Sequence, residues 1–148
     1  MKIENSQSKG KYLSLDYGDR RVGMAVSDED KEISFPRDFL EYQKNPELIA
    51  RLKAFCEEEG IVRIILGFPI QMDGRVGERA EKTQRFHAEL KQAMPTMEIV
   101  FFDERLSTEF AVKALRGQGI KDKDQKGKRD MMSAQIILQN YLASIHEA

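Results

Sequence analysis

Residues 12–28 read YLSLDYGDRRVGMAVSD, and this stretch decides the fold. In its first half apolar and polar residues alternate, with Leu13 and Leu15 on one side of the chain, which is the period-2 pattern of a β-strand. The GDR sequence that follows predicts a tight turn, after which residues 22–28 pair back as a second strand. A weaker third strand is expected near residues 33–40. The chain therefore begins with a predicted antiparallel meander of three strands.

After residue 44 the sequence alternates between helix and strand patterns. Asn45 and Pro46 predict the start of a helix, with Asn45 as the N-cap and Pro46 at the first helical position, and Gly60 predicts its end. Residues 61–67 are nearly all apolar, which favours a strand buried on both faces in a parallel pairing. The remaining elements are expected as a helix at about 76–94, a short buried strand at 98–102, and helices near 108–116 and 129–145. This order predicts an α/β fold in which helices pack on a five-stranded mixed sheet.

Length and composition exclude several classes of protein. The 148 residues suit a single domain, which we expect to span residues 11–145 after a disordered polar leader at residues 1–10. Cys56 is the only cysteine, which excludes an intramolecular disulfide and a cysteine-rich zinc site and favours a reducing, cytoplasmic location. No apolar run approaches the roughly 20 residues of a membrane span. The net charge of −1 argues against a uniformly basic nucleic-acid binder but leaves room for a local basic patch.

Carboxylates occupy unusual positions in the predicted strands. Asp16 lies within the first strand, although aspartate is disfavoured in strands. Asp103 and Glu104 directly follow the strand at 98–102, and ligand sites of open α/β sheets gather at the carboxyl ends of strands. Each position also has an ordinary interpretation, a turn cap for Asp16 and solvated loop carboxylates for the Asp-Glu pair. Taken singly, these residues leave both interpretations open.

Asp130 shares one helical face with Ala134, Ile137 and Tyr141. This face is expected to pack on the sheet, so Asp130 is predicted to point inward, although an acidic partner of the helix dipole is the ordinary interpretation. If Asp130 and Asp16 converge with the Asp-Glu pair, carboxylates about 4 Å apart repel by roughly 4 kcal/mol at an effective dielectric constant of about 20. Such a cluster calls for a cation, and oxygen ligands select Mg²⁺ or Mn²⁺ over zinc. Two such ions about 3.5–4 Å apart are typical of enzymes that catalyse in-line displacement at phosphorus.

Four motifs make the sequence recognisable as a set. They are DYGDRRVGMAVSD at residues 16–28, IILGFPIQMDG at 64–74, FFDERLST at 101–108 and RDMMSAQIILQNYL at 129–142. In this order they resemble the YqgF family, also called RuvX, whose members are described as Holliday-junction resolvases or pre-16S rRNA nucleases. The resemblance covers nearly all of the chain from residue 11 to about residue 142. It implies a ribonuclease H-like fold with an acidic, metal-dependent active site.

By position, the resemblance assigns the catalytic and metal-binding roles to three residues. Asp16 matches the first-strand aspartate of the family, Glu104 the glutamate of the DERLST motif, and Asp130 the helix aspartate. Asp103 is a further candidate for the site, ranked below Glu104. The implied cofactor is Mg²⁺ or Mn²⁺, with one ion held by Asp16 and Glu104 and a second shared by Asp16 and Asp130.

Arginines lie close to these carboxylates in the sequence. Arg20 and Arg21 are on the predicted turn of the first hairpin, and Arg105 is in the third motif. We predict that these three arginines contact nucleic acid. Further cations are Arg75, Arg79, Arg129 and the four lysines of a predicted mobile loop at residues 117–128. Solvated surface charge is the ordinary interpretation of each cation alone. With 8% aromatic residues and no tryptophan, we expect recognition of backbone and shape, and binding that weakens steeply with salt.

The leading functional interpretation is a two-metal-ion nuclease that hydrolyses phosphodiester bonds in structured RNA. The resemblance implies processing of the 5′ end of precursor 16S rRNA during ribosome biogenesis. The alternative within the same class is endonucleolytic resolution of four-way DNA junctions in recombination and repair. A non-catalytic nucleic-acid-binding module is the alternative of another class, and a phosphotransferase is disfavoured because its nucleotide cleft needs two domains.

We expect a monomer or a weak homodimer, no membrane partner, and no catalytic role for His87 within a helix, His146 in a frayed tail, or Cys56.

Overall fold

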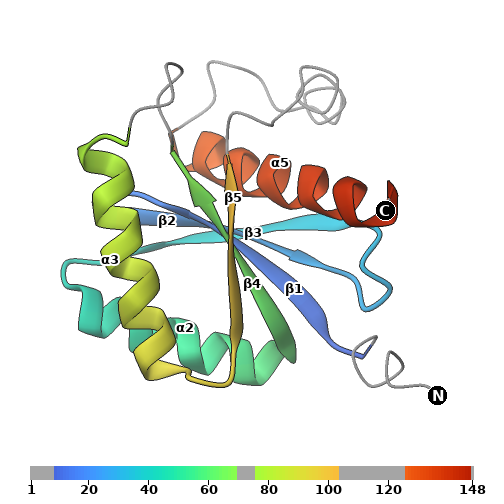
Figure 1. Ribbon diagram of the computed structural model, residues 1–148, viewed down its shortest axis with the longest axis horizontal. Helices are drawn as coiled ribbons and strands as arrows, with labels where there is room; N and C mark the ends of the chain where they lie inside the picture. The colour runs from blue at the N-terminus through green and yellow to red at the C-terminus, as the bar shows by residue number, and fades with distance from the viewer. Residues whose placement is uncertain (1–8, 70–75, 104–125, 148) are drawn as a thin grey trace.

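The computed structural model describes residues 9–69, 76–103 and 126–147 of the chain (Figure 1). In chain order the elements are β1 (Lys11–Tyr17), β2 (Arg21–Ser27), β3 (Ser34–Glu41), α2 (Asn45–Glu59), β4 (Ile61–Phe68), α3 (Glu78–Ala93), β5 (Glu98–Asp103) and α5 (Lys126–Glu147). The strands form one sheet in the order β3-β2-β1-β4-β5. β1, β2 and β3 pair antiparallel, whereas β1, β4 and β5 run parallel. The predicted meander and the predicted mixed sheet of five strands are both confirmed.

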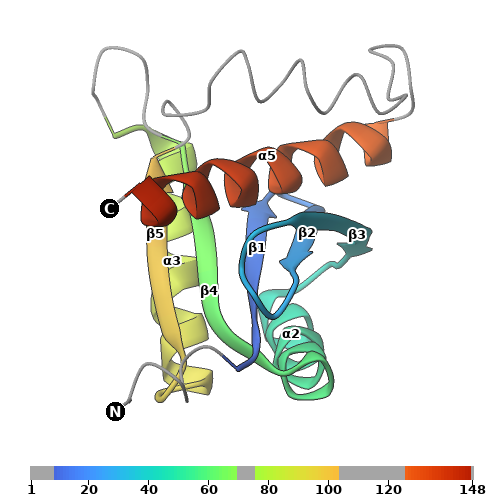
Figure 2. The ribbon, with the colours of Figure 1, turned by 90° about the vertical axis from the view of Figure 1, so that its right-hand side faces the viewer.

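Helices cover both faces of the sheet, as Figure 1 shows. α2 and α3 pack on one face, and α5 runs across the other (Figure 2). The alternation along β1 divides its side chains between the two cores: Leu13 and Leu15 pack with Leu52 of α2, whereas Tyr12 packs with Leu138 of α5. Burial of each leucine contributes about 1.5–3 kcal/mol to folding. The period-2 pattern in the sequence therefore sets which residues of β1 face α5.

Helix α2 begins one residue earlier than predicted. Lys44, and not Asn45, is the N-cap residue, and it provides no side-chain cap. The Asn45 side chain is bound elsewhere, because its oxygen accepts a 3.0 Å hydrogen bond from the Tyr17 hydroxyl and its amide donates to Glu89 at 2.8 Å. The N-cap prediction is wrong because these tertiary partners bind the side chain that would cap the helix. Gly60 ends the helix as predicted, in the left-handed conformation with φ 69° and ψ 42°.

Two further predictions are corrected. α5 begins at Lys126, so residues 126–128, predicted as the end of a loop, are helical. β5 is an edge strand and not a fully buried one, which leaves the Phe101 side chain 41% exposed while Phe102 is buried. The predicted helix near 108–116, the rest of the predicted loop and most of the predicted leader lie outside the described residues. Among the described helices, none is long and apolar enough to cross a membrane.

Candidate active site

The carboxyl ends of the parallel strands β1, β4 and β5 lie at the same end of the sheet (Figure 1). We call this end the carboxyl edge. Asp16 is the penultimate residue of β1. Leu15 pairs with Leu66 of β4, which places Asp16 at the level of Gly67. Gly67 pairs in turn with Phe102 of β5. Asp16 is therefore at the edge where ligand sites of parallel sheets gather.

Asp16 is on the face of the sheet that α5 covers. Two residues before it, the Ser14 hydroxyl donates a 2.7 Å hydrogen bond to the backbone carbonyl of Ala134 in α5. Two residues earlier still, Tyr12 packs edge-on against Tyr141 of α5, with ring centroids 6.1 Å apart. Because side chains alternate along a strand, Asp16 shares this face. Its side chain is half-buried.

α5 carries the second predicted site residue, Asp130. The two contacts just described order the helix along β1, with Tyr141 over the start of the strand and Ala134 over its middle. Followed toward its own start, α5 therefore moves in the direction of Asp16. The backbone of Asp130 is one turn, about 6 Å along the helix axis, before Ala134. Ala134 and Ile137, which belong to the predicted sheet-facing stripe, are buried as expected.

The other predicted acidic residues lie at or beyond the end of β5. Asp103 is the last residue of this strand and is half-buried. Glu104 and Arg105 follow it in the sequence and lie outside the described residues. β4 separates β1 from β5, so the ends of these two strands are about 10 Å apart. Within the part of the chain that the structure describes, no group of three or more acidic, histidine or cysteine side chains forms a metal site. The carboxylate triad therefore stays a prediction.

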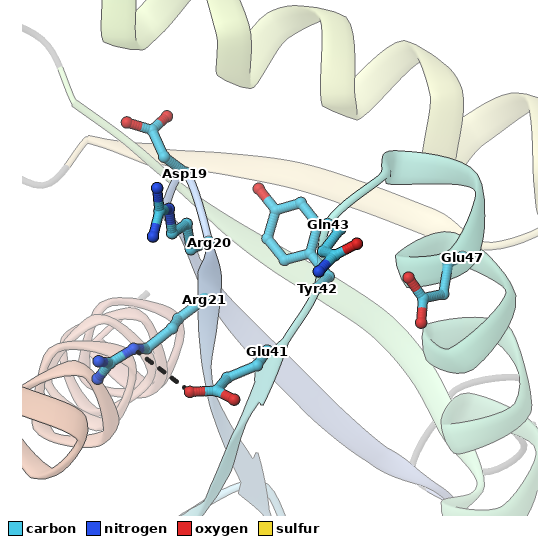
Figure 3. Close-up of a pocket in the computed structure, with 7 residues that line it drawn as sticks. All are labelled: Asp19, Arg20, Arg21, Glu41, Tyr42, Gln43 and Glu47. Carbon is cyan, nitrogen blue, oxygen red and sulfur yellow. Dashed lines mark ion pairs between the residues drawn. The ribbon is translucent and has the colours of Figure 1, made fainter.

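Two of the predicted nucleic-acid contacts are neighbours, Arg20 on the turn between β1 and β2 and Arg21 at the first position of β2. Arg21 approaches the Glu41 carboxylate to 4.0 Å, and its guanidinium lies over the Phe39 ring at 4.9 Å from the centroid. Arg20 beside it is exposed. Both arginines line a pocket, shown in Figure 3, whose lining residues are Asp19, Arg20, Arg21, Glu41, Tyr42, Gln43 and Glu47. The pocket presents two guanidinium groups, and its acidic residues limit the positive charge.

Gly18 allows this turn to be tight. Its amide donates a 2.8 Å hydrogen bond to the backbone carbonyl of Arg21. A Cβ atom at position 18 would lie 2.7 Å from that same oxygen, closer than real contacts allow. Any side chain at this position would therefore push the hairpin open two residues after Asp16.

Arg79 of α3 binds the same turn. Its guanidinium donates to the Asp19 carboxylate at 2.7 Å and to the backbone carbonyl of Tyr17. The positive charge of Arg79 lowers the pKa of Asp19 below its ordinary value. Two donors of Arg79 are thus used within the molecule, so this arginine contributes little to the predicted track of phosphate contacts. Arg75, expected beside it, lies outside the described residues.

The two histidines and the cysteine are engaged within the fold. Cys56 is in the core, and burial raises the pKa of its thiol to about 12. His87 of α3 is 3.1 Å from the Ile99 carbonyl. His146 belongs to α5 and is 2.6 Å from the Lys31 carbonyl, so the prediction of a frayed tail there is wrong. That none of the three is a catalytic group stays a prediction.

The structure gives Ser14 and Arg79 contacts that the sequence did not predict, although the sequence did name Arg79 as one of several cations near the carboxylates. For Ser14 a signal is present, because a hydroxyl within a buried strand needs a hydrogen-bond partner. For Arg79 no local signal exists, because Asp19 and Tyr17 are 60 and 62 residues away in the sequence.

Known sequences resemble this chain over most of its length. The model of the RuvX family, described as Holliday junction resolvase, matches residues 10–144. A protein of Chloroflexus aurantiacus (strain ATCC 29366 / DSM 635 / J-10-fl), named "Putative pre-16S rRNA nuclease", is 38% identical over 130 residues, which cover 88% of this chain and 84% of that protein. A protein of the same name from Acetivibrio thermocellus is 38% identical over 133 residues, which cover 89% of this chain and 94% of that protein.

Solved structures share the fold at low sequence identity. T. thermophilus RuvC in complex with Holliday junction substrate gives a TM-score of 0.63 at 11% identity, covering 93% of this chain and 96% of that chain. The yeast mitochondrial Holliday junction resolvase Ydc2 gives a TM-score of 0.57 at 11% identity, covering 88% of this chain and 77% of that chain. At these identities the likeness establishes the fold alone. It is a RuvC-like ribonuclease H fold, which confirms the fold that the sequence motifs implied.

Proposed function

The chain belongs to the RuvX family, and from this membership we propose that it is a nuclease that hydrolyses phosphodiester bonds in precursor 16S rRNA. The observation that carries the proposal is the position of Asp16, a half-buried carboxylate on the central strand, at the carboxyl edge and on the face that α5 covers. Relatives that match over most of their length carry the name of this activity. The proposed role is processing of the 5′ end of the rRNA during ribosome biogenesis, in the cytoplasm, by a monomer or weak homodimer.

We assign Asp16, Glu104 and Asp130 to the catalytic centre. Two observations support the set: β5 ends at the edge that holds Asp16, one residue before Glu104, and α5 approaches this edge toward its start. Carboxylate oxygens are the ligands that Mg²⁺ and Mn²⁺ prefer, so the donor chemistry fits a hard divalent ion. Such an ion, when bound, polarises the phosphate and makes its bound water more acidic. Asp16 would be the central ligand, because β1 is the central strand of the sheet and lies beneath α5.

Arg20, Arg21 and Arg105 are assigned to the RNA backbone. Guanidinium groups match phosphate oxygens in a two-pronged geometry and stay charged at any physiological pH. Arg20 lies on the turn that follows β1 and Arg21 is the first residue of β2, so both would hold phosphates that flank the scissile bond. Such contacts fix the position of the RNA and carry no sequence information.

The test is cleavage of a precursor 16S rRNA fragment with its unprocessed 5′ end, with Mg²⁺ or Mn²⁺. We expect the wild-type protein to shorten this RNA, and Asp16→Asn to lower the rate by at least about 100-fold. Asp38→Asn is the matched control, because Asp38 is an exposed aspartate of another strand, β3. RNA left intact by the wild-type protein with both ions would overturn the proposal. Equal rates for wild type and Asp16→Asn would indicate a nucleic-acid-binding module without catalysis at this carboxylate.

Resolution of four-way DNA junctions is the second candidate function, and the description of the matching family favours it. Symmetric cuts in a junction require two active sites, so this activity predicts a homodimer. Cleavage of a labelled four-way junction, together with analytical ultracentrifugation of the protein on that junction, measures both properties. A monomer that leaves the junction intact removes this candidate.

A further inference from the structure

The turn that follows Asp16 is held from outside by helix α3. The Arg79 guanidinium donates to the Tyr17 carbonyl and, at 2.7 Å, to the Asp19 carboxylate. It also lies over the Tyr17 ring, 5.4 Å from the centroid. One side chain therefore grips the backbone immediately after Asp16 and the side chain at the tip of the turn.

The Tyr17 side chain is fixed by the same helix. Its ring stacks on Phe86 of α3, with centroids 4.0 Å apart and ring planes 4° apart. On the turn itself, the Tyr42 hydroxyl donates to the Gly18 carbonyl. Tyr17 is on the α3 side of the sheet and Asp16 is on the α5 side. Contacts on one face of the sheet thus hold the residue next to the predicted metal ligand on the other face.

The exposure of these groups indicates which Arg79 contact matters. The Asp19 side chain is 69% exposed and that of Arg79 is 35% exposed, so their ion pair contributes little to stability. Lys82, one turn along α3, also approaches Asp19, at 3.5 Å, and contacts no carbonyl of the turn among the described residues. The hydrogen bond from the charged guanidinium to the Tyr17 carbonyl is the contact that Lys82 does not duplicate.

We propose that Arg79 is a positioning residue, which sets the carboxylate of Asp16 for ion binding by holding the Tyr17 carbonyl and the tip of the turn. The inference rests on the proposed function, because it takes Asp16 as a metal ligand. Groups that orient metal ligands are needed for full affinity even when they do not touch the ion. Arg79 would act through Asp16, without contact with the RNA.

The experiment measures Mn²⁺ binding to the full chain without RNA, by isothermal titration calorimetry, for wild type, Arg79→Met, Arg79→Lys and Lys82→Met. We expect Arg79→Met to raise the Kd for Mn²⁺ by about ten-fold. Lys82→Met, the matched control on the same helix and the same carboxylate, should stay within about two-fold of wild type. Arg79→Lys keeps the charge and loses the two-pronged grip, so its Kd should fall between those of wild type and Arg79→Met.

A second measurement follows the turn directly. The Gly18 amide closes the turn on the Arg21 carbonyl, and its hydrogen exchange should become about ten-fold faster in Arg79→Met. In cleavage assays, the same variant should lower kcat and leave KM for the RNA unchanged. If Arg79→Met does not fold, Arg79→Lys decides the matter by the same three measurements.

Three outcomes would overturn the inference. If Arg79→Met binds Mn²⁺ with unchanged affinity and has a lower Tm, Arg79 contributes to stability alone. If Arg79→Met binds Mn²⁺ with unchanged affinity but has a raised KM for the RNA and RNA binding that depends less on salt, Arg79 contacts the RNA. A wild-type protein without Mn²⁺ affinity would overturn the inference together with the metal site. A wild-type protein that binds Mn²⁺ but leaves precursor rRNA intact would remove the proposed substrate only, and the Arg79 variants would still decide the positioning role.

Discussion

The two faces of the sheet are packed in different ways. The core beneath α2 and α3 is built mainly from leucine, isoleucine, valine and aromatic side chains. Beneath α5, hydrogen bonds join the helix to the sheet. Two are buried: Ser14 donates to the Ala134 carbonyl at 2.7 Å, and the Gln135 amide donates to the Ser34 carbonyl at 3.1 Å. A third, from Ser34 to Gln139 at 2.8 Å, is partly buried. Apolar packing is not directional, whereas hydrogen bonds fix the register between two elements.

The difference follows the roles proposed for the helices. α2 and the apolar face of α3 complete the scaffold, and α3 also supplies Arg79 to the turn after Asp16. α5 carries Asp130, whose position relative to Asp16 must be set for ion binding. Polar contacts have a cost, since the Gln135 side-chain oxygen is buried without a hydrogen-bond partner among the described residues. We infer that the α5 face gives up some stability for a defined helix position. Four predictions test this contrast, from the largest expected effect to the smallest.

Truncation of one buried leucine on each face separates stability from position. Leu52→Ala in α2 and Leu138→Ala in α5 remove side chains that are both fully buried. Each should lower the free energy of unfolding by about 2–5 kcal/mol in urea titrations. Folded Leu138→Ala protein should require a higher Mn²⁺ concentration for half-maximal cleavage than wild type, because the cavity loosens the packing of α5 on the sheet. This concentration is the Mn²⁺ requirement in the predictions below. An equal shift for Leu52→Ala would break the contrast between the two faces.

Removal of one buried hydroxyl at a time sharpens the contrast within the α5 face. Ser14→Ala and Ser34→Ala each delete a hydrogen bond to α5, so each should cost about 1 kcal/mol of unfolding free energy. Only Ser14 lies two residues from Asp16 on the same face. Ser14→Ala should therefore also raise the Mn²⁺ requirement for cleavage, with Ser34→Ala as its control. Identical Mn²⁺ titrations for the two variants would show that the Ser14 bond sets no register.

The parts of the fold that the sequence predicted depend on local periodicity. The alternation of β1 assigned Leu13 and Leu15 to one core and Ser14 to the other face, and the structure confirms this division. The stripe on the last helix likewise predicted the burial of Ala134 and Ile137. Both patterns are written in consecutive residues, because side-chain direction repeats every two residues in a strand and every 3.6 in a helix.

The parts that the sequence did not predict depend on partners far away along the chain. Asn45 is bound by Tyr17 and Glu89, so its preference for capping a helix is overridden. Phe101 is exposed because β5 lies at the edge of the sheet, and strand order is not visible in the composition of a strand. For the candidate site, sequence placed Asp16 correctly at the end of β1, but the role of Arg79 emerges only from contacts across 60 residues.

Two tyrosine hydroxyls offer a smaller test of the same contrast. The Tyr141 hydroxyl accepts a 2.9 Å hydrogen bond from Arg63 on the α5 face, and the Tyr17 hydroxyl donates to Asn45 on the other. Tyr141→Phe and Tyr17→Phe should each lower the free energy of unfolding by about 0.5–1 kcal/mol, measured in urea. Tyr141→Phe should shift the Mn²⁺ requirement slightly, whereas Tyr17→Phe keeps the carbonyl that Arg79 holds and should not. A larger shift for Tyr17→Phe would place the sensitive contact on the α3 side.

The smallest expected effect concerns an ion pair of the scaffold. Glu59 at the end of α2 is 3.2 Å from Arg37 and 3.5 Å from Lys11, and the hydrogen bond from Arg37 lowers the pKa of Glu59 below its ordinary value of 4.5. A carboxyl whose pKa is lowered by folding stabilises the fold above the unfolded pKa and loses this contribution as the pH falls through the folded pKa. Glu59→Gln should therefore be less stable than wild type at neutral pH and equal to it in acid.

The difference at neutral pH should stay below about 1 kcal/mol, because the pair is partly exposed and screened by solvent. Urea unfolding across this pH range without divalent ions measures it, and Glu57→Gln, an exposed carboxylate of the same helix, is the control. Glu59→Gln should leave the Mn²⁺ requirement for cleavage unchanged, because α2 belongs to the scaffold face and contributes no residue to the carboxyl edge. A shift in that requirement would mean that charge at the opposite end of the sheet reaches Asp16, and the two faces would then not be independent.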